Sequence, residues 1–115
     1  MSLTLIEKPW GKEELLEHNA RYMFKRLTML KGHACSLQYH EIKTESVYVL
    51  SGILKLYIGD SKEELSEQLM HPGDFITLNP FKVHRMEALE DTVYLEASTP
   101  ELEDVVRLED RYKRS

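Results

Sequence analysis

Apolar and polar residues alternate over short stretches along most of this chain, and turn-forming residues separate the stretches. Short alternating stretches are typical of half-buried β-strands. We therefore predict strands over residues 22–30, 34–39, 46–50, 53–58, 65–70, 74–78, 85–88 and 92–97. The turns between them are marked by Lys31-Gly32, Ser51-Gly52, Gly59-Asp60-Ser61, His71-Pro72-Gly73 and Asn79-Pro80. Many short strands at this spacing predict an all-β protein, either an antiparallel sandwich or a barrel.

Three stretches show the alternation less clearly. We interpret residues 1–20 as a short irregular N-terminal lead, in which Pro9-Trp10-Gly11 forms a turn beside an aromatic anchor. Residues 61–68 are rich in Glu and Lys and would suit a helical turn, but the turn residues on both sides favour a hairpin. The tail over residues 100–115 is charged, and both a short helix and a strand laid on the barrel are compatible with it.

Size and charge restrict the classes of function. With 115 residues and 13.5 kDa, we expect one domain over residues 1–115, with its core at about 22–98. A net charge of -5 argues against a nucleic-acid partner, although local basic groups, such as the run from Arg107 to Arg114, would suit a small anion. Without a long apolar segment, we predict a cytoplasmic protein with no membrane partner.

Four metal-competent side chains, those of Gln38, His40, Glu45 and His84, lie on or next to predicted strands. Gln38 and His40 are two residues apart, so on a strand they point to the same side. Glu45 comes just before the next strand, and His84 just before a third. These residues could converge inside one small barrel, which predicts a site for a divalent metal ion.

The remaining reactive residues have simpler interpretations. His18, His33 and His71 lie in the lead or next to turns, where a histidine is usually structural or exposed. Cys35 differs in parity from Gln38, so we expect a buried thiol that faces away from the interior. As the only cysteine, it excludes an internal disulfide and a cysteine-based zinc site. The sequence contains no glycine-rich phosphate loop and no nucleophile elbow.

The spacing Gly32-x5-Gln38-x-His40-x4-Glu45-x6-Gly52, followed by His84, resembles the two motifs of the cupin superfamily. Within it, the chain resembles the C-terminal cupin domain of bifunctional mannose-6-phosphate isomerase/mannose-1-phosphate guanylyltransferases. The matching stretches are Lys8-Pro9-Trp10-Gly11, Lys25-Arg26-Leu27, Ser36-Leu37-Gln38-Tyr39-His40, Glu45, Ser51-Gly52, His84-Arg85, Leu95-Glu96 and residues 106–114. They extend over almost the whole chain, and a Gln in place of the first cupin His is specific to this subfamily.

The resemblance implies a jelly-roll barrel that holds one divalent metal ion through Gln38, His40, Glu45 and His84, with zinc as the first choice and manganese, iron, cobalt or nickel also compatible. It also implies an aldose–ketose isomerase that acts on a phosphorylated sugar, mannose 6-phosphate in the family, and a phosphorylated sugar or sugar nucleotide as the ligand. We assign Lys43 and Glu96 as candidate catalytic residues. Lys25, Arg85 and Arg107 are candidates for binding the substrate.

The chain departs from the subfamily after the first metal His and in the second motif, whose usual Pro, Gly and Asn positions are here Asn79, Phe81 and Ala88. Glu41-Ile42-Lys43 replaces a His-His-Arg run, and Phe81 replaces a Gly at the pocket mouth, which we expect to change the pocket shape. An alternative hypothesis is therefore a non-catalytic cupin that binds a sugar or sugar nucleotide as a sensor or accessory subunit. A metal oxygenase with iron is a third, which Gln38 disfavours. We also expect a homodimer, because short cupin barrels leave apolar sheet edges for a second copy to cover.

Overall fold

The computed structural model describes residues 4–114, and over this range the chain forms β-strands and no helix. In chain order the strands are β1 (Thr4–Lys8), β2 (Gly11–His18), β3 (Met23–Met29), β4 (Leu37–Tyr39), β5 (Glu45–Ser51), β6 (Leu54–Gly59), β7 (Leu65–Met70), β8 (Phe75–Leu78), β9 (Val83–Ala88), β10 (Thr92–Ser98) and β11 (Val106–Glu109). The all-β prediction is confirmed, and every predicted strand has a counterpart among these elements.

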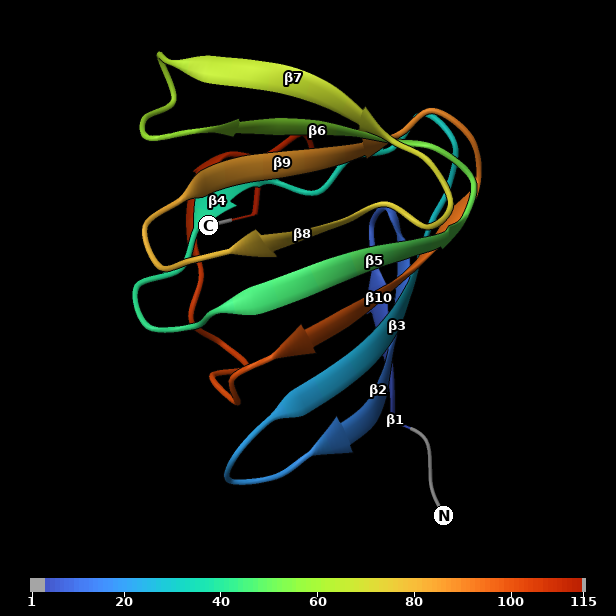
Figure 1. The fold of residues 1–115 in the computed structure, drawn as a ribbon, viewed down its shortest axis with the longest axis vertical. Helices are drawn as coiled ribbons and strands as arrows, with labels where there is room; N and C mark the ends of the chain where they lie inside the picture. The colour runs from blue at the N-terminus through green and yellow to red at the C-terminus, as the bar shows by residue number, and fades with distance from the viewer. Residues whose placement is uncertain (1–3, 115) are drawn as a thin grey trace.

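The strands form two antiparallel sheets, which Figure 1 shows curving around a shared interior. One sheet has the order β1-β2-β3-β10-β5-β8, and the other has the order β11-β4-β9-β6-β7. Neighbours in each sheet come from distant parts of the chain, as for β3 beside β10 and β4 beside β9. Residues near positions 40, 45, 84 and 96 are therefore gathered at one end of the interior.

The core follows from the alternation along the strands. In β5, residues 45, 47 and 49 are buried while the residues between them are exposed, because successive side chains on a strand point to opposite faces. Inward-facing apolar side chains from both sheets form one cluster: Trp10, Leu27, Met29, Val47, Val49, Leu54, Leu56, Met70, Leu78, Met86, Ala88 and Tyr94. The aromatic anchor expected at Trp10 belongs to this cluster and is 3% exposed.

The prediction of an irregular lead was wrong. Residues 4–18 form the hairpin β1–β2, which adds two strands to the six-stranded sheet, with Lys8 paired to Gly11 at the turn. The alternation is weak here because β1 is an edge strand and the register of β2 against β3 shifts between Leu15 and Glu17. At Gly11, a Cβ atom would lie 1.9 Å from the carbonyl oxygen of Thr28, so this tight turn requires glycine.

The two other ambiguous stretches are resolved by strand pairing. Residues 61–64 form the turn between β6 and β7, which confirms the hairpin. The tail contains β11, which pairs with β4 and extends the five-stranded sheet, so the strand alternative holds. Between residues 4 and 114 no helix is long and apolar enough to cross a membrane. The cytoplasmic location stays a prediction.

Candidate metal centre

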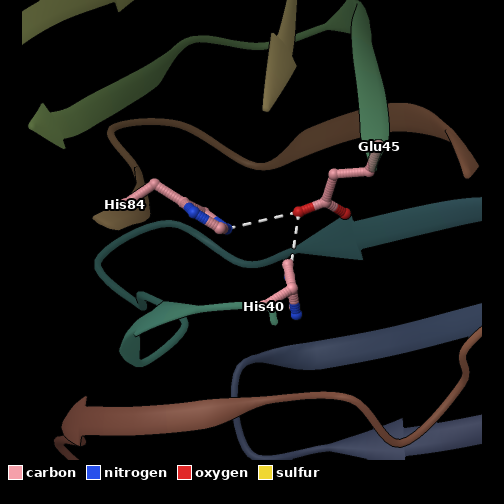
Figure 2. Close-up of side chains that lie close together, drawn as sticks. All are labelled: His40, Glu45 and His84. Carbon is pink, nitrogen blue, oxygen red and sulfur yellow. Dashed lines mark hydrogen bonds and ion pairs between the residues drawn. The ribbon is translucent and has the colours of Figure 1, made fainter. Parts of the chain in front are cut away.

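Three of the four proposed ligands converge inside the fold (Figure 2). His40 follows β4, Glu45 begins β5 and His84 lies in β9; all three are buried, and their donor atoms lie within 4.8 Å of one another. Glu45 Oε1 lies 3.1 Å from His40 Nε2 and 3.2 Å from His84 Nε2. We call these three residues the metal centre. Two imidazole nitrogens and one carboxylate oxygen are a donor set that suits zinc and other transition metals.

Gln38 lies beside this group. In the ladder between β4 and β9 it is the direct partner of His84, and residues paired in this way point to the same face of a sheet. Its side chain lines the same cavity, and its amide oxygen accepts a hydrogen bond from the Ser36 hydroxyl. A role for Gln38 as the fourth ligand is therefore compatible with its position and stays a proposal.

The hydrogen bonds of the two histidines favour a cation. His40 Nδ1 contacts the carbonyl oxygen of Asp104, and His84 Nδ1 lies 2.9 Å from that of Lys82. A carbonyl oxygen only accepts hydrogen bonds, so we assign the proton of each ring to Nδ1. Each Nε2 then presents a lone pair to the carboxylate of Glu45, which is also an acceptor. A metal ion among these atoms removes the conflict, whereas two imidazolium rings would add charges to a buried site.

Asp104 holds the chain between two of the ligands. Its carboxylate accepts hydrogen bonds from the backbone N–H groups of Glu41, Ile42 and Lys43, at 3.1, 2.8 and 2.8 Å. Although burial opposes ionisation, these N–H groups lower the pKa of Asp104, so it remains a carboxylate. Asp104 therefore holds the loop 41–43 through its carboxylate and the ring of His40 through its backbone carbonyl oxygen.

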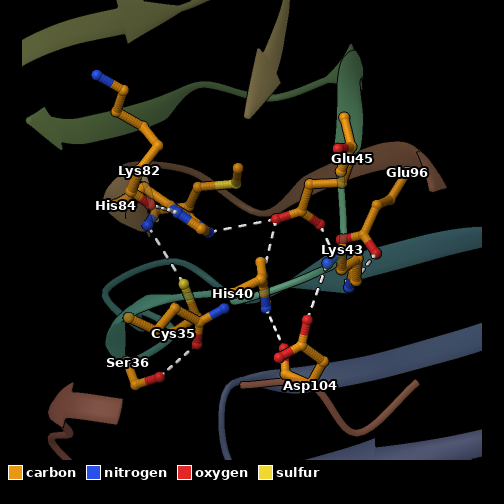
Figure 3. A network of polar contacts seen from close by, with 12 residues as sticks. Cys35, Ser36, His40, Lys43, Glu45, Lys82, His84, Glu96 and Asp104 are labelled. Carbon is orange, nitrogen blue, oxygen red and sulfur yellow. Dashed lines mark hydrogen bonds and ion pairs between the residues drawn. The ribbon is translucent and has the colours of Figure 1, made fainter. Parts of the chain in front are cut away.

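The two candidate catalytic residues contact the metal centre and each other (Figure 3). Lys43 Nζ lies 3.3 Å from Glu96 Oε2 and 3.5 Å from Glu45 Oε2, and all three side chains are buried. Burial alone would lower the pKa of Lys43, but the charges of Glu96 and Glu45 raise it to about 12. Burial, followed by the charge of Glu45, raises the pKa of Glu96. One lysine is thus shared by two carboxyl groups of unequal acidity.

The metal centre opens into a cavity of about 250 Å³. Of the three candidate substrate-binding residues, Lys25 and Arg107 line this cavity, and Lys25 is ion-paired to Glu13 at 2.9 Å. Arg85 is not among its lining residues; its guanidinium group donates to the carbonyl oxygens of Cys35 and Glu109 at 3.0 Å each. The structure therefore brings Lys25 and Arg107 to the site. Arg85, on β9, instead links the segment before β4 to the end of β11.

The cavity residues that were not assigned a role from the sequence include Lys8, Arg114 and Asp104. Lys8 was missed because it belongs to the hairpin that we interpreted as irregular. The basic run at the end of the chain was the available signal for Arg114. Nothing in the sequence shows that Asp104 caps a loop some sixty residues earlier, since that contact depends on how the tail folds back.

The expectation that Cys35 faces away from the interior was wrong, because its side chain lines the cavity. Residues 35 and 36 lie between an isolated bridge at Ala34 and the start of β4, so strand parity does not apply to them. The thiol is partly rather than fully buried, and its structural role stays a prediction. Burial raises the pKa of Cys35 to about 11, and its Sγ accepts the N–H of Met86 at 3.3 Å.

Most of the departures from the subfamily lie outside the cavity. Glu41, Ile42 and Phe81 are exposed and are not among its lining residues, so the expected change of pocket shape at Phe81 is not observed. The backbone of Phe81 has a φ of +68°, a left-handed conformation that favours glycine. Its ring lies 5.8 Å from that of Tyr39. Only Lys43 of the departing residues reaches the site.

The fold is that of a cupin. An RmlC-like cupin from Shewanella frigidimarina superposes on this chain with a TM-score of 0.74 at 16% sequence identity, over 89% of this chain and 87% of that one. At this level of identity the likeness shows the fold alone. The predicted cupin jelly roll is confirmed.

The sequence matches the family described as "Mannose-6-phosphate isomerase C-terminal" over residues 3–110, and the chain belongs to that family. It is 31% identical to the mannose-1-phosphate guanylyltransferase ManC of Salmonella typhimurium, over 95% of this chain and 23% of that protein. It is 30% identical to the xanthan biosynthesis protein XanB of Xanthomonas campestris pv. campestris, over 96% and 24%. The chain thus spans about a quarter of the length of these relatives.

Proposed function

We propose that this protein is a metal-dependent aldose–ketose isomerase for a sugar phosphate of the mannose 6-phosphate type, in activated-sugar or surface-polysaccharide metabolism. The observation that carries the proposal is the pair of imidazole lone pairs aimed at the Glu45 carboxylate, with Glu96 and Lys43 beside them. The family and the names of the relatives support the substrate class. Because the chain spans only part of those relatives, the guanylyltransferase activity named for one of them is not carried over.

The metal centre fits one divalent ion, held by His40, Glu45 and His84 with Gln38 as the fourth ligand. Zinc is our first choice, and manganese, iron, cobalt and nickel also accept this donor set. Such an ion would polarise the carbonyl oxygen of a sugar and stabilise negative charge on it.

The catalytic roles follow from the two groups beside the metal centre. Interconversion of an aldose and a ketose moves a proton between C1 and C2 through a cis-enediol. Glu96 is the group that we assign to this transfer, because its raised pKa lets it both accept and donate a proton near neutral pH. Lys43 remains charged and stabilises the negative charge that develops on the sugar oxygens. Lys25 and Arg107 are the proposed contacts to the phosphate, and Arg85 acts through the strands it joins.

One contact favours the alternative of a sugar-binding accessory subunit without turnover. Lys43 is ion-paired to Glu96, the proposed base, at 3.3 Å. A base held in an ion pair is a weaker acceptor of a carbon-bound proton than a solitary carboxylate. The two hypotheses share the metal centre and the ligand class, and they differ in whether Glu96 can be released from Lys43 when the sugar binds.

Turnover of mannose 6-phosphate by the purified protein separates these hypotheses. The protein is stripped with a chelator, reloaded singly with zinc, manganese, cobalt, iron or nickel, and fructose 6-phosphate is measured by NMR. We expect product with at least one metal and none with the stripped protein. Metal-dependent binding of mannose 6-phosphate without product would support the accessory subunit. A protein that takes up no metal would contradict both.

We also propose that two copies associate through the outer face of the six-stranded sheet. Tyr48 and Phe75 are paired in register there and are 44% and 75% exposed, which is unusual for aromatic side chains. Sedimentation equilibrium is expected to give twice the 13.5 kDa chain mass. Phe75→Lys should shift the protein toward the monomer, whereas Leu69→Lys, at an exposed residue of the other sheet, should not. A monomeric unmodified protein would refute this association.

A further inference from the structure

The cavity extends from the metal centre to a group of cations that no catalytic role accounts for. Lys8 on β1, Lys25 on β3, Arg107 on β11 and Arg114 after β11 all line it, and we call these four residues the basic cluster. Lys8 and Arg107 lie on one edge strand of each sheet, β1 and β11, and Lys25 lies on β3, two strands in from β1. The cavity connects these strands to the metal centre.

Strand register shows how the two groups are connected. In the five-stranded sheet Gln38 is paired with His84 on one side and with Arg107 on the other, so these three residues form one row across the sheet. In the six-stranded sheet Glu96 is paired with Lys25, and β2 and β1 follow toward the edge. Neighbouring strands are about 4.8 Å apart, so the cations lie one to several strand spacings beyond the metal centre. That arrangement suits a molecule with a carbonyl at one end and an anion at the other.

Two of the cations of the basic cluster share one carboxylate. Glu13 serves both Lys25 at 2.9 Å and Lys8 at 3.9 Å, while Arg114 is ion-paired to Asp110 at 2.7 Å. Burial lowers the pKa of Lys8; Glu13 opposes this shift, and the charges of Lys25, Arg114 and Arg107 add to it. A bound anion of two negative charges would relieve that repulsion.

We propose that the basic cluster is the subsite for the terminal phosphate of the sugar substrate, with Lys8 and Arg114 as contacts in addition to Lys25 and Arg107. The inference rests on the proposed function, since it places the carbonyl end of the same substrate at the metal centre. It assigns a binding role to the N-terminal hairpin, whose residue Lys8 reaches the cavity from the edge of the fold.

The test begins with metal-free full-length protein and inorganic phosphate, so that phosphate cannot bind to a metal ion. Lys8→Gln is expected to weaken phosphate binding about tenfold, as for loss of one charge-assisted hydrogen bond. Lys8→Arg keeps the charge and should keep the affinity. Lys12→Gln is the matched control, because Lys12 is next to the same turn, pairs with Glu14 at 3.4 Å and does not line the cavity. Equal affinities for the Lys8→Gln and Lys12→Gln variants, or no binding by the unmodified protein, would overturn the proposal.

Metal-loaded protein then distinguishes this inference from the proposed function. A rise of about tenfold in the KM for mannose 6-phosphate in Lys8→Gln, with kcat little changed, supports both. If the unmodified protein does not isomerise the sugar but its phosphate binding depends on Lys8, the subsite stands and the proposed function fails. If it isomerises the sugar and Lys8→Gln has the unmodified KM, the subsite fails and the proposed function stands. Melting curves of all variants verify folding.

Discussion

Replacing His84 with alanine is expected to reduce metal binding from one divalent ion per chain to a level near zero. His84 supplies one of the two nitrogen donors of the metal centre, and among residues 4–114 this group contains no further His, Cys, Asp or Glu to replace it. Loss of a residue that merely orients a ligand costs roughly 10- to 100-fold in metal affinity, and loss of the ligand itself should cost more. Isomerase activity should disappear with the metal.

The measurement is the metal content of the protein after gel filtration, by elemental analysis, together with the formation of fructose 6-phosphate. His71→Ala is the matched control, because His71 is exposed and lies in the turn before β8. His84→Gln keeps most of the buried volume and shows whether any loss reflects unfolding. Full metal content in the folded His84→Ala protein would refute the proposed metal centre.

The sequence predicted the metal centre because its residues obey strand parity. His40 and Glu45 flank a short loop, and the buried face of β5 continues from Glu45 through two valines, so the alternation reports the direction of each side chain correctly. His84 lies within β9, which begins two residues earlier than predicted, and its inward direction follows from the pairing with Gln38. Where residues lie on regular strands, the alternation of apolar and polar positions was sufficient to predict which side chains point into the interior.

The parts that the sequence did not predict depend on contacts between distant segments. Cys35 lies in an irregular stretch, where parity gives the wrong direction. Lys8 belongs to a hairpin whose hydrogen bonds to β3, rather than its own alternation, make it a strand. Asp104 and Arg114 reach the site only because β11 pairs with β4 and returns the tail to the cavity. The charged C-terminal tail therefore contributes residues that line the cavity.

The positions of the departing residues show which of them can affect the site. Glu41, Ile42 and Phe81 are exposed, and their side chains do not line the cavity. The remaining departure, Lys43, places a flexible ammonium group where the family has a planar guanidinium group. Of the departures marked by the resemblance, Lys43 is the one that reaches the site, where it contacts Glu96 and Glu45.

Lys43→Met is accordingly expected to be the most destabilising single substitution at the site, by about 3–5 kcal/mol in the metal-free protein. Methionine fills a similar volume but leaves the buried carboxyl groups of Glu45 and Glu96 facing each other without a cation. Protonation of Glu96 would reduce this cost. Because the pKa of Glu96 is already raised to about 8, the deficit relative to the unmodified protein should be largest above pH 8. It should shrink as the pH falls through that value, because the proton gained by Glu96 replaces the lysine charge.

Urea unfolding of the metal-free variants, followed by circular dichroism over a range of pH, measures this effect. The double variant Lys43→Met/Glu96→Gln should recover much of the lost stability, since only one buried carboxylate then remains. Lys55→Met serves as the control, because Lys55 forms an ion pair at the surface with Glu67 at 2.9 Å and such exposed pairs contribute little. If Lys43→Met were as stable as Lys55→Met above pH 8, the two carboxyl groups would not share the lysine charge, and Lys43 would be available to the substrate alone.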